Sequence, residues 1–284
     1  MFGPGIDEYR NVLRRYWRVG LVALPGLALA AELLRRGRIP QARDYFGFVD
    51  GRTLGRVPNA LNVLSNLAFA VVGIAGLWIL LSGRARLGDP RERAPWLVFF
   101  GAVAATSCGS AWFHIAPSID SLVWDRLPMA VAFMALLSAL IAERIGAAAG
   151  ARLLAPLTLA GLASVPAWWW TEHIGAGDLR PYLLVQFYPL LAVPVVLALF
   201  PARYSHSGVW LVSLGAYLLA KGAEVADEAV FRLGGIVSGH TLKHLLAAAG
   251  IGALAAMLAL RRPERSARPA PARRAVATDG WYAK

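Results

Sequence analysis

Long apolar stretches repeat along most of this 284-residue chain, and they limit what it can fold into. Each is about 18–22 residues long, which is enough to cross the hydrocarbon core of a bilayer as one α-helix. Because lipid offers no hydrogen-bond partner to the backbone, such segments must satisfy their own backbone groups as helices. The sequence therefore predicts an all-α membrane protein built as a bundle of seven transmembrane helices. Their approximate bounds are 60–81, 96–114, 122–142, 153–170, 182–200, 209–230 and 240–260.

The composition agrees with a chain that lies mostly in lipid. Hydrophobic residues make up 57% of it and charged residues only 16%. The net charge of +12 comes mainly from arginines in the termini and loops, without the interleaved aromatic residues of a nucleic-acid-binding surface. We therefore expect no nucleic acid as a partner, and no obligate protein partner is evident. The single cysteine, Cys108, excludes an intramolecular disulfide and a cysteine-based zinc site, so any metal must use His and carboxylate ligands.

An eighth apolar stretch, residues 19–34, follows a basic segment near the N-terminus. With the small-residue pattern Ala28-Leu29-Ala30 it has the form of a signal peptide, whereas Asp7 and Glu8 before it favour an additional membrane helix. Both interpretations stay open. The predicted organisation is an N-terminal basic and hydrophobic segment at 1–35, an outer loop at 36–59, the seven-helix domain at 60–260 and a disordered basic tail at 261–284.

The arginines also predict an orientation, because loops rich in Lys and Arg stay on the cytoplasmic side. Four arginines lie between the first and second predicted helices, and six follow the seventh. Arg35, Arg36 and Arg38 oppose this orientation but are outnumbered. We therefore expect a multi-pass protein with a cytoplasmic C-terminus and with the segment before Ala60 outside.

Histidines within the apolar stretches need a partner or a function, because ionisable groups are costly in lipid. Of the five histidines, His114, His240 and His244 lie in or at the ends of predicted helices, whereas His173 and His206 fall in loops. His240 and His244 are four residues apart, so their imidazoles share one helix face and can bind one ion. Alone, such a pair is a weak signal of a metal site.

Two more polar residues fall at the same predicted depth as the histidines. Ser110 lies one turn before His114 at the end of the second helix, and Asp125 lies near the start of the third. In isolation Asp125 is equally well explained as a partner for Arg126. The second helix ends on the outer side, where the third and seventh begin, so topology brings all these groups together.

Three histidines with an open fourth position are the ligand set of a catalytic zinc site rather than a structural one. In such a site Asp125 is the natural base for an attacking water, and Ser110 would help to hold the water or the developing oxyanion.

In the sixth predicted helix, Lys221, Glu224 and Glu228 share a face, and we interpret them as a charge cluster in which Glu224 neutralises Lys221.

Taken together, the motifs resemble the alkaline ceramidase family, its bacterial members in particular, within the CREST superfamily of membrane hydrolases. The resemblance extends over residues 59–248. The motifs that carry it are Asn62-Val-Leu-Ser65-Asn66, Gly109-Ser110-Ala-Trp-Phe-His114, Asp125-Arg-Leu-Pro128-Met129 and Ser238-Gly-His240-Thr-Leu-Lys-His244.

The resemblance implies a seven-helix fold with Zn²⁺ on the three histidines and with Ser110 and Asp125 in catalytic roles. It implies a membrane lipid as substrate, namely ceramide or a similar N-acyl lipid, cleaved at its amide to a free fatty acid and an amine. Its likeness to bacterial members implies the bacterial inner membrane, and the orientation predicted from the arginines puts the active site toward the outer leaflet. It also implies Ca²⁺ before the first helix, for which Asp44, Asp50 and Asn59 are the candidate ligands, although their charge is lower than the family pattern.

Two other functions stay open on the sequence. A serine intramembrane protease would use Ser110 as the nucleophile and a membrane histidine as its base. A lipid-sensing seven-helix receptor would use the metal only to hold helices together. A covalent serine probe distinguishes the first from a metal hydrolase, and turnover on N-acyl lipids distinguishes the second.

Overall fold

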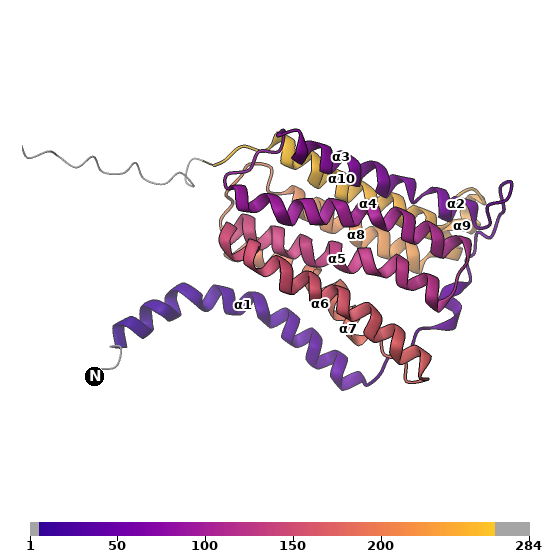
Figure 1. The fold of residues 1–284 in the computed structure, drawn as a ribbon, viewed down its shortest axis with the longest axis horizontal. Coiled ribbons are helices and arrows are strands. Elements are labelled where there is room, and N and C mark those ends of the chain that lie inside the picture. The colour runs from indigo at the N-terminus through magenta and orange to yellow at the C-terminus, as the bar shows by residue number, and fades with distance from the viewer. Residues whose placement is uncertain (1–5, 265–284) are drawn as a thin grey trace, which may run out of the picture.

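The computed structural model describes residues 6–264, with side chains from residue 17 onward, and the described part is all-α without a strand. Long helices lie side by side in one bundle, and the first helix runs along its flank (Figure 1). The helices are α1 (Ile6–Arg36), α2 (Ala60–Leu64), α3 (Leu67–Leu81), α4 (Arg93–Ile115), α5 (Ile119–Arg144), α6 (Ala147–His173), α7 (Arg180–Leu199), α8 (Val209–Val225), α9 (Asp227–Gly234) and α10 (Gly239–Leu260), with short 3-10 turns η1 (Arg43–Phe46) and η2 (Pro90–Glu92).

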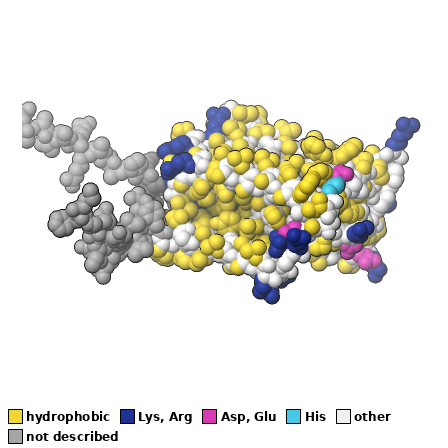
Figure 2. Space-filling model, turned by 60° about the horizontal axis from the view of Figure 1, so that its bottom comes forward, with side chains coloured by type: hydrophobic (Ala, Val, Ile, Leu, Met, Phe, Trp, Pro, Cys, Tyr) yellow, Lys and Arg dark blue, Asp and Glu magenta, His cyan; other side chains and the backbone are white. Residues whose placement is uncertain are grey.

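The prediction of an all-α membrane bundle is confirmed. Seven helical segments of the described chain are long and apolar enough to cross a membrane, one of them residues 17–36 of α1, and the bent pair α8 and α9 is an eighth candidate. Large hydrophobic side chains such as Val71, Ile74 and Leu218 stay exposed on the outer helix faces. Figure 2 shows hydrophobic side chains over most of one face of the bundle. In water such a surface would be unfavourable, whereas in a bilayer it contacts lipid.

The N-terminal apolar stretch forms the helix α1 and packs against α7. The Tyr188 hydroxyl donates to the carbonyl oxygen of Val22 at 3.1 Å. The Tyr188 ring lies so close to Gly26 that a Cβ there would be 2.8 Å from two ring atoms. The stretch thus forms a helix on the flank of the bundle, and both the signal-peptide and the membrane-helix interpretations of it stay predictions.

The first predicted span is interrupted between α2 and α3 by its own polar side chains. Ser65 Oγ and Asn66 Nδ2 both donate to the Asn62 carbonyl oxygen, at 3.1 and 2.7 Å. Side-chain bonds of this kind compete with the helical backbone ladder. Ser65 and Asn62, on either side of the end of α2, both contact residues of α10, which matters for the site described below.

The sixth predicted span is also broken, because α8 and α9 meet at an angle of 78°. The start of α10 packs into this bend, where a Cβ on Gly239 would lie 2.0 Å from the Ala223 carbonyl oxygen. The expectation that Glu228 shares a helix face with Lys221 is therefore wrong. Glu228 lies beyond the bend and pairs with Arg232 on the surface.

At the opposite end of the bundle, Arg261 is fully buried rather than part of a tail. Its guanidinium pairs with Glu143, and its Nε donates to the Arg86 carbonyl oxygen at 3.0 Å. Residues 261–264 are thereby bound to the bundle, which corrects the predicted start of the tail. The rest of the predicted tail, 265–284, lies outside the described residues.

Gly109 brings α4 into backbone contact with α5 beside the candidate site. An ideal Cβ at Gly109 would lie 2.0 Å from the Trp124 carbonyl oxygen and 3.3 Å from the Asp125 amide nitrogen. Both are backbone atoms, which cannot rotate away as a flexible side chain can. The glycine therefore sets how closely Ser110 on α4 approaches Asp125 on α5.

Gly109→Ala should destabilise the protein by about 1–3 kcal/mol, because the added methyl group overpacks the α4–α5 contact. Gly101→Ala is the matched control on the same helix, since a Cβ there meets nothing within 4 Å. Thermal unfolding of both variants and the wild type in one detergent measures the difference. Equal melting temperatures for Gly109→Ala and Gly101→Ala would contradict the tight α4–α5 contact.

Candidate metal centre

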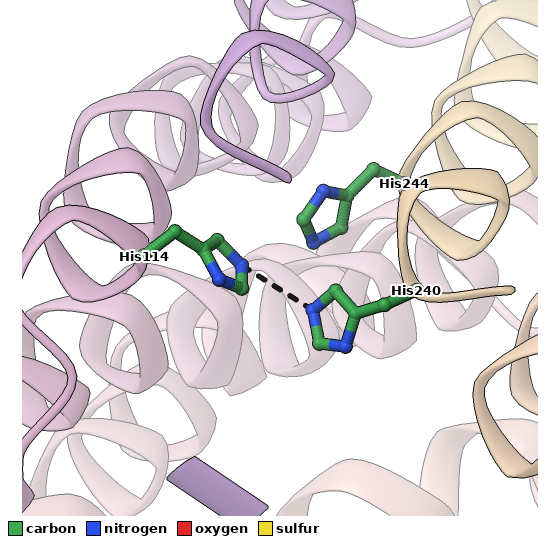
Figure 3. Close-up of side chains that lie close together, drawn as sticks. All are labelled: His114, His240 and His244. Atoms are coloured by element: carbon green, nitrogen blue, oxygen red, sulfur yellow. Dashed lines mark hydrogen bonds between the residues drawn. The ribbon is translucent and has the colours of Figure 1, made fainter. Parts of the chain in front are cut away.

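Three buried histidines from two distant parts of the chain converge at one end of the bundle. His114 lies in the last turn of α4, and His240 and His244 lie in the first turns of α10 (Figure 3). One ligand nitrogen from each lies within 4.8 Å of the others. His114 Nε2 and His240 Nε2 are 3.3 Å apart. Among the described residues, no other group of three His, Cys, Asp or Glu side chains brings its ligand atoms so close together.

The geometry of the trio fits one metal ion. Two nitrogens bound at 2.0–2.1 Å to a tetrahedral ion are about 3.4 Å apart, close to the 3.3 Å between His114 and His240. Two facing imidazole nitrogens otherwise repel through their lone pairs unless a proton or an ion lies between them. Imidazole suits zinc, copper, iron and nickel, so the three histidines lie close enough to bind a metal ion but do not select a particular one.

Ser65 orients one of the three rings. Its Oγ lies 2.7 Å from His244 Nδ1, which leaves Nε2 of that ring free to bind an ion. Partners of this kind fix the tautomer and direction of a metal-binding histidine. Ser65 belongs to the resembling motif in the first span, but the sequence did not reveal that it contacts His244.

Polar contacts also hold the helix ends that carry the histidines. The His240 backbone N–H donates to Asp227 Oδ1 at 2.7 Å, and Asn59 Nδ2 donates to the His114 carbonyl oxygen at 2.8 Å. Thr241 Oγ1 donates to Asn62 Oδ1 at 2.8 Å and so joins α10 to α2. The histidines are therefore positioned by contacts from α2, from α9 and from the loop before α2.

Ser110 and Asp125, the predicted catalytic pair, line one cavity together with His244. The cavity has a volume of about 350 Å³. Both residues are buried, and the Ser110 side chain lies beside the Asp125 carboxyl group. The expected convergence of polar groups from the second, third and seventh predicted helices is thus present in the structure.

Lys243 lies beside the histidine trio, a position that the sequence did not predict. Its Nζ lies 3.0 Å from His240 Nε2 and donates to Glu224 Oε1 at 2.9 Å. Glu224 also pairs with Lys221, as the sequence predicted. The spacing of three residues between His240 and Lys243 was the signal that could have placed both on one helix face.

The candidate calcium ligands have protein partners instead. Asp50 is buried and accepts from the Arg52 guanidinium at 2.7 Å through each carboxylate oxygen, and this contact lowers the pKa of the Asp50 carboxyl. The Asn59 amide is bonded to the carbonyl oxygen of His114. Asp44 is exposed in η1. Calcium binding stays a prediction that these contacts do not favour.

Compared with protein-family models and with curated proteins, the chain matches none of them. The resemblance to alkaline ceramidases therefore rests on the sequence motifs.

Replacing a ligand of the trio should remove the bound metal, because two imidazoles leave too few ligands for a stable site. We expect about one metal ion per chain in the wild type and a loss of most of it in His240→Ala and His244→Ala. His173→Ala and His206→Ala change histidines outside the trio and should keep the metal. Elemental mass spectrometry on purified protein measures the ratio, and a full ion in His244→Ala would refute the site.

Ser65→Ala should weaken metal affinity by about 10- to 100-fold, because the His244 ring loses the partner that orients it. Ser82→Ala at the far end of α3 is the control, since Ser82 contacts no ligand of the trio. Competition with a chelator of known affinity measures the change. Unaltered affinity in Ser65→Ala would show that the Ser65–His244 contact does not support the metal.

Proposed function

We propose that this chain is a zinc-dependent membrane hydrolase that cleaves the amide bond of ceramide or a similar N-acyl lipid, releasing a free fatty acid and an amine. The observation that carries the proposal is that His244, a member of the buried histidine trio, lines one cavity with Ser110 and Asp125. A structural zinc site normally has four protein ligands, whereas a catalytic site keeps one position open. A trio without a fourth His, Cys, Asp or Glu among the described residues supports the catalytic case.

The cavity offers room for a lipid chain. A second, apolar cavity of about 120 Å³ shares Phe69, Phe133 and Tyr217 with the lining of the larger one, so the two adjoin. The remaining lining of the smaller cavity is almost entirely hydrophobic. An acyl chain placed there would extend toward the larger cavity, whose lining includes Asp125.

Hydrolysis adds water across the amide, so a proton must move from the water to the nitrogen of the leaving amine as the C–N bond breaks. Zinc, when bound, supplies a Lewis acid that polarises a carbonyl and activates water. The Asp125 carboxylate accepts the proton and returns it to the amine. The Ser110 hydroxyl holds the carboxylate in place or donates to the oxyanion. Ser65 keeps the His244 ring in position throughout.

The serine protease alternative is less well supported by the contacts of Ser110. A serine nucleophile needs an adjacent base such as histidine. Within the described residues no hydrogen bond joins Ser110 to a histidine, and its neighbour is the Asp125 carboxyl. A receptor that uses the metal only structurally would not need the buried carboxylate beside the cavity.

The proposed location is the bacterial inner membrane, with the site toward the outer leaflet and the C-terminus in the cytoplasm. The histidines lie at one end of α4 and α10, and Arg86 bonds to Leu258 near the other end of α10. The arginine-rich loop that the positive-inside rule assigns to the cytoplasm is thus opposite the site.

Asp125→Asn should lower the rate of fatty-acid release by about 10²- to 10⁴-fold, the usual contribution of a general base, while the metal stays bound. Asp120→Asn on the same helix is the control, because the Asp120 side chain is largely exposed. The assay measures fatty acid released from ceramide in detergent micelles, before and after zinc chelation. Full activity in Asp125→Asn, or in the chelated wild type, would reject the mechanism.

A further inference from the structure

Arg126 is a buried cation in the wall of the larger cavity, next to Asp125 along α5. Only 5% of the residue is exposed. Its Nη2 donates to Gln41 Oε1 at 2.7 Å. Its guanidinium carbon lies 4.3 Å from the centre of the Trp168 ring and 4.8 Å from that of Tyr182. Arg126 is thus held by a neutral amide and aromatic faces.

The guanidinium of Arg126 keeps an unused donor. Its Nη1 is buried and has no hydrogen-bond partner, and none of the ion pairs in the described part of the chain includes Arg126. A buried charge is unfavourable without a partner of opposite sign, and aromatic rings replace only part of what water provides. The planar fork of arginine matches a carboxylate or phosphate through two parallel bonds. The surroundings of Arg126 are therefore those of an anion-binding group.

The other charges around the cavity leave one positive charge in excess. Its lining includes the cations Arg126, Lys221 and Lys243 and the carboxylates Asp125 and Glu224, which gives 3 − 2 = +1. Glu224 pairs with both lysines, and Asp125 lies beside Ser110. No ion pair in the described part of the chain joins Arg126 to either carboxylate, and a ligand with a single negative charge would balance the charge of the lining.

We propose that Arg126 binds a carboxylate on the substrate, so that the enzyme takes N-acyl amino acids in preference to neutral N-acyl lipids. The inference rests on the proposed function, since it names the substrate class of the same site. In an N-acyl amino acid the carboxylate is attached one carbon away from the amide nitrogen. Asp125 and Arg126 line the same cavity from adjacent positions, so the amide can lie beside one while the carboxylate pairs with the other.

The test uses N-oleoylglycine and N-oleoylethanolamine, which share one acyl chain and differ in a carboxylate against a hydroxymethyl group. We expect kcat/KM of the wild type to favour N-oleoylglycine by about tenfold or more, the usual value of a charge-assisted hydrogen bond. In Arg126→Gln the ratio should fall toward one. Arg180→Gln is the control, because Arg180 pairs with Asp178 and does not line the cavity, and its ratio should equal that of the wild type.

A binding measurement on the metal-loaded protein separates recognition from turnover. It uses uncleavable analogues of the two lipids, in which an ether replaces the amide. The wild type should bind the carboxylate analogue more tightly than the hydroxyl analogue, whereas Arg126→Gln should bind the two with equal affinity. If neither lipid is hydrolysed while the carboxylate analogue binds more tightly, the hydrolase proposal fails and the role of Arg126 stands. If the wild type has equal kcat/KM for the two substrates and equal affinity for the two analogues, the inference is overturned. This outcome needs only the wild type, so it holds even if Arg126→Gln does not fold.

Discussion

Three buried imidazoles converge at one end of the helix bundle, and the rest of the site is arranged around them. His114 reaches the site from α4, and His240 and His244 reach it from α10, more than a hundred residues later. Polar side chains at such a place are costly unless something binds them. A shared ion would compensate for that cost, and the proposed hydrolase would use the ion in its reaction.

The helices around the site are shaped to hold these rings in place. Gly109 lets α4 touch the backbone of α5, and Gly239 lets α10 enter the bend between α8 and α9. Beside the break between α2 and α3, Ser65 bonds to His244 and Asn62 bonds to Thr241. The α2–α3 break and the α8–α9 bend thus both lie beside the histidine trio. Metal-binding side chains generally depend on such supporting contacts for their position.

Much of the fold was predictable, because an apolar segment long enough to cross a bilayer can satisfy its own backbone hydrogen bonds only as a helix. The histidine trio was predictable because the ends of two predicted helices fall at one depth. The bend at Ala226, between α8 and α9, was not predictable, because Gly239 packs into it from a helix later in the sequence. Arg261 looked like the start of a cytoplasmic tail, and only the fold reveals its partner Glu143. The contacts of Arg126 and Lys243 likewise depend on neighbours distant in sequence.

X-ray absorption at the zinc edge, measured on the purified full chain, reports whether one zinc ion is bound by the three imidazoles. Zinc bound by the trio should have three imidazole nitrogens and one further light atom at about 2.0–2.1 Å. A sample without bound zinc, or a zinc shell with fewer than three imidazoles, would contradict this coordination.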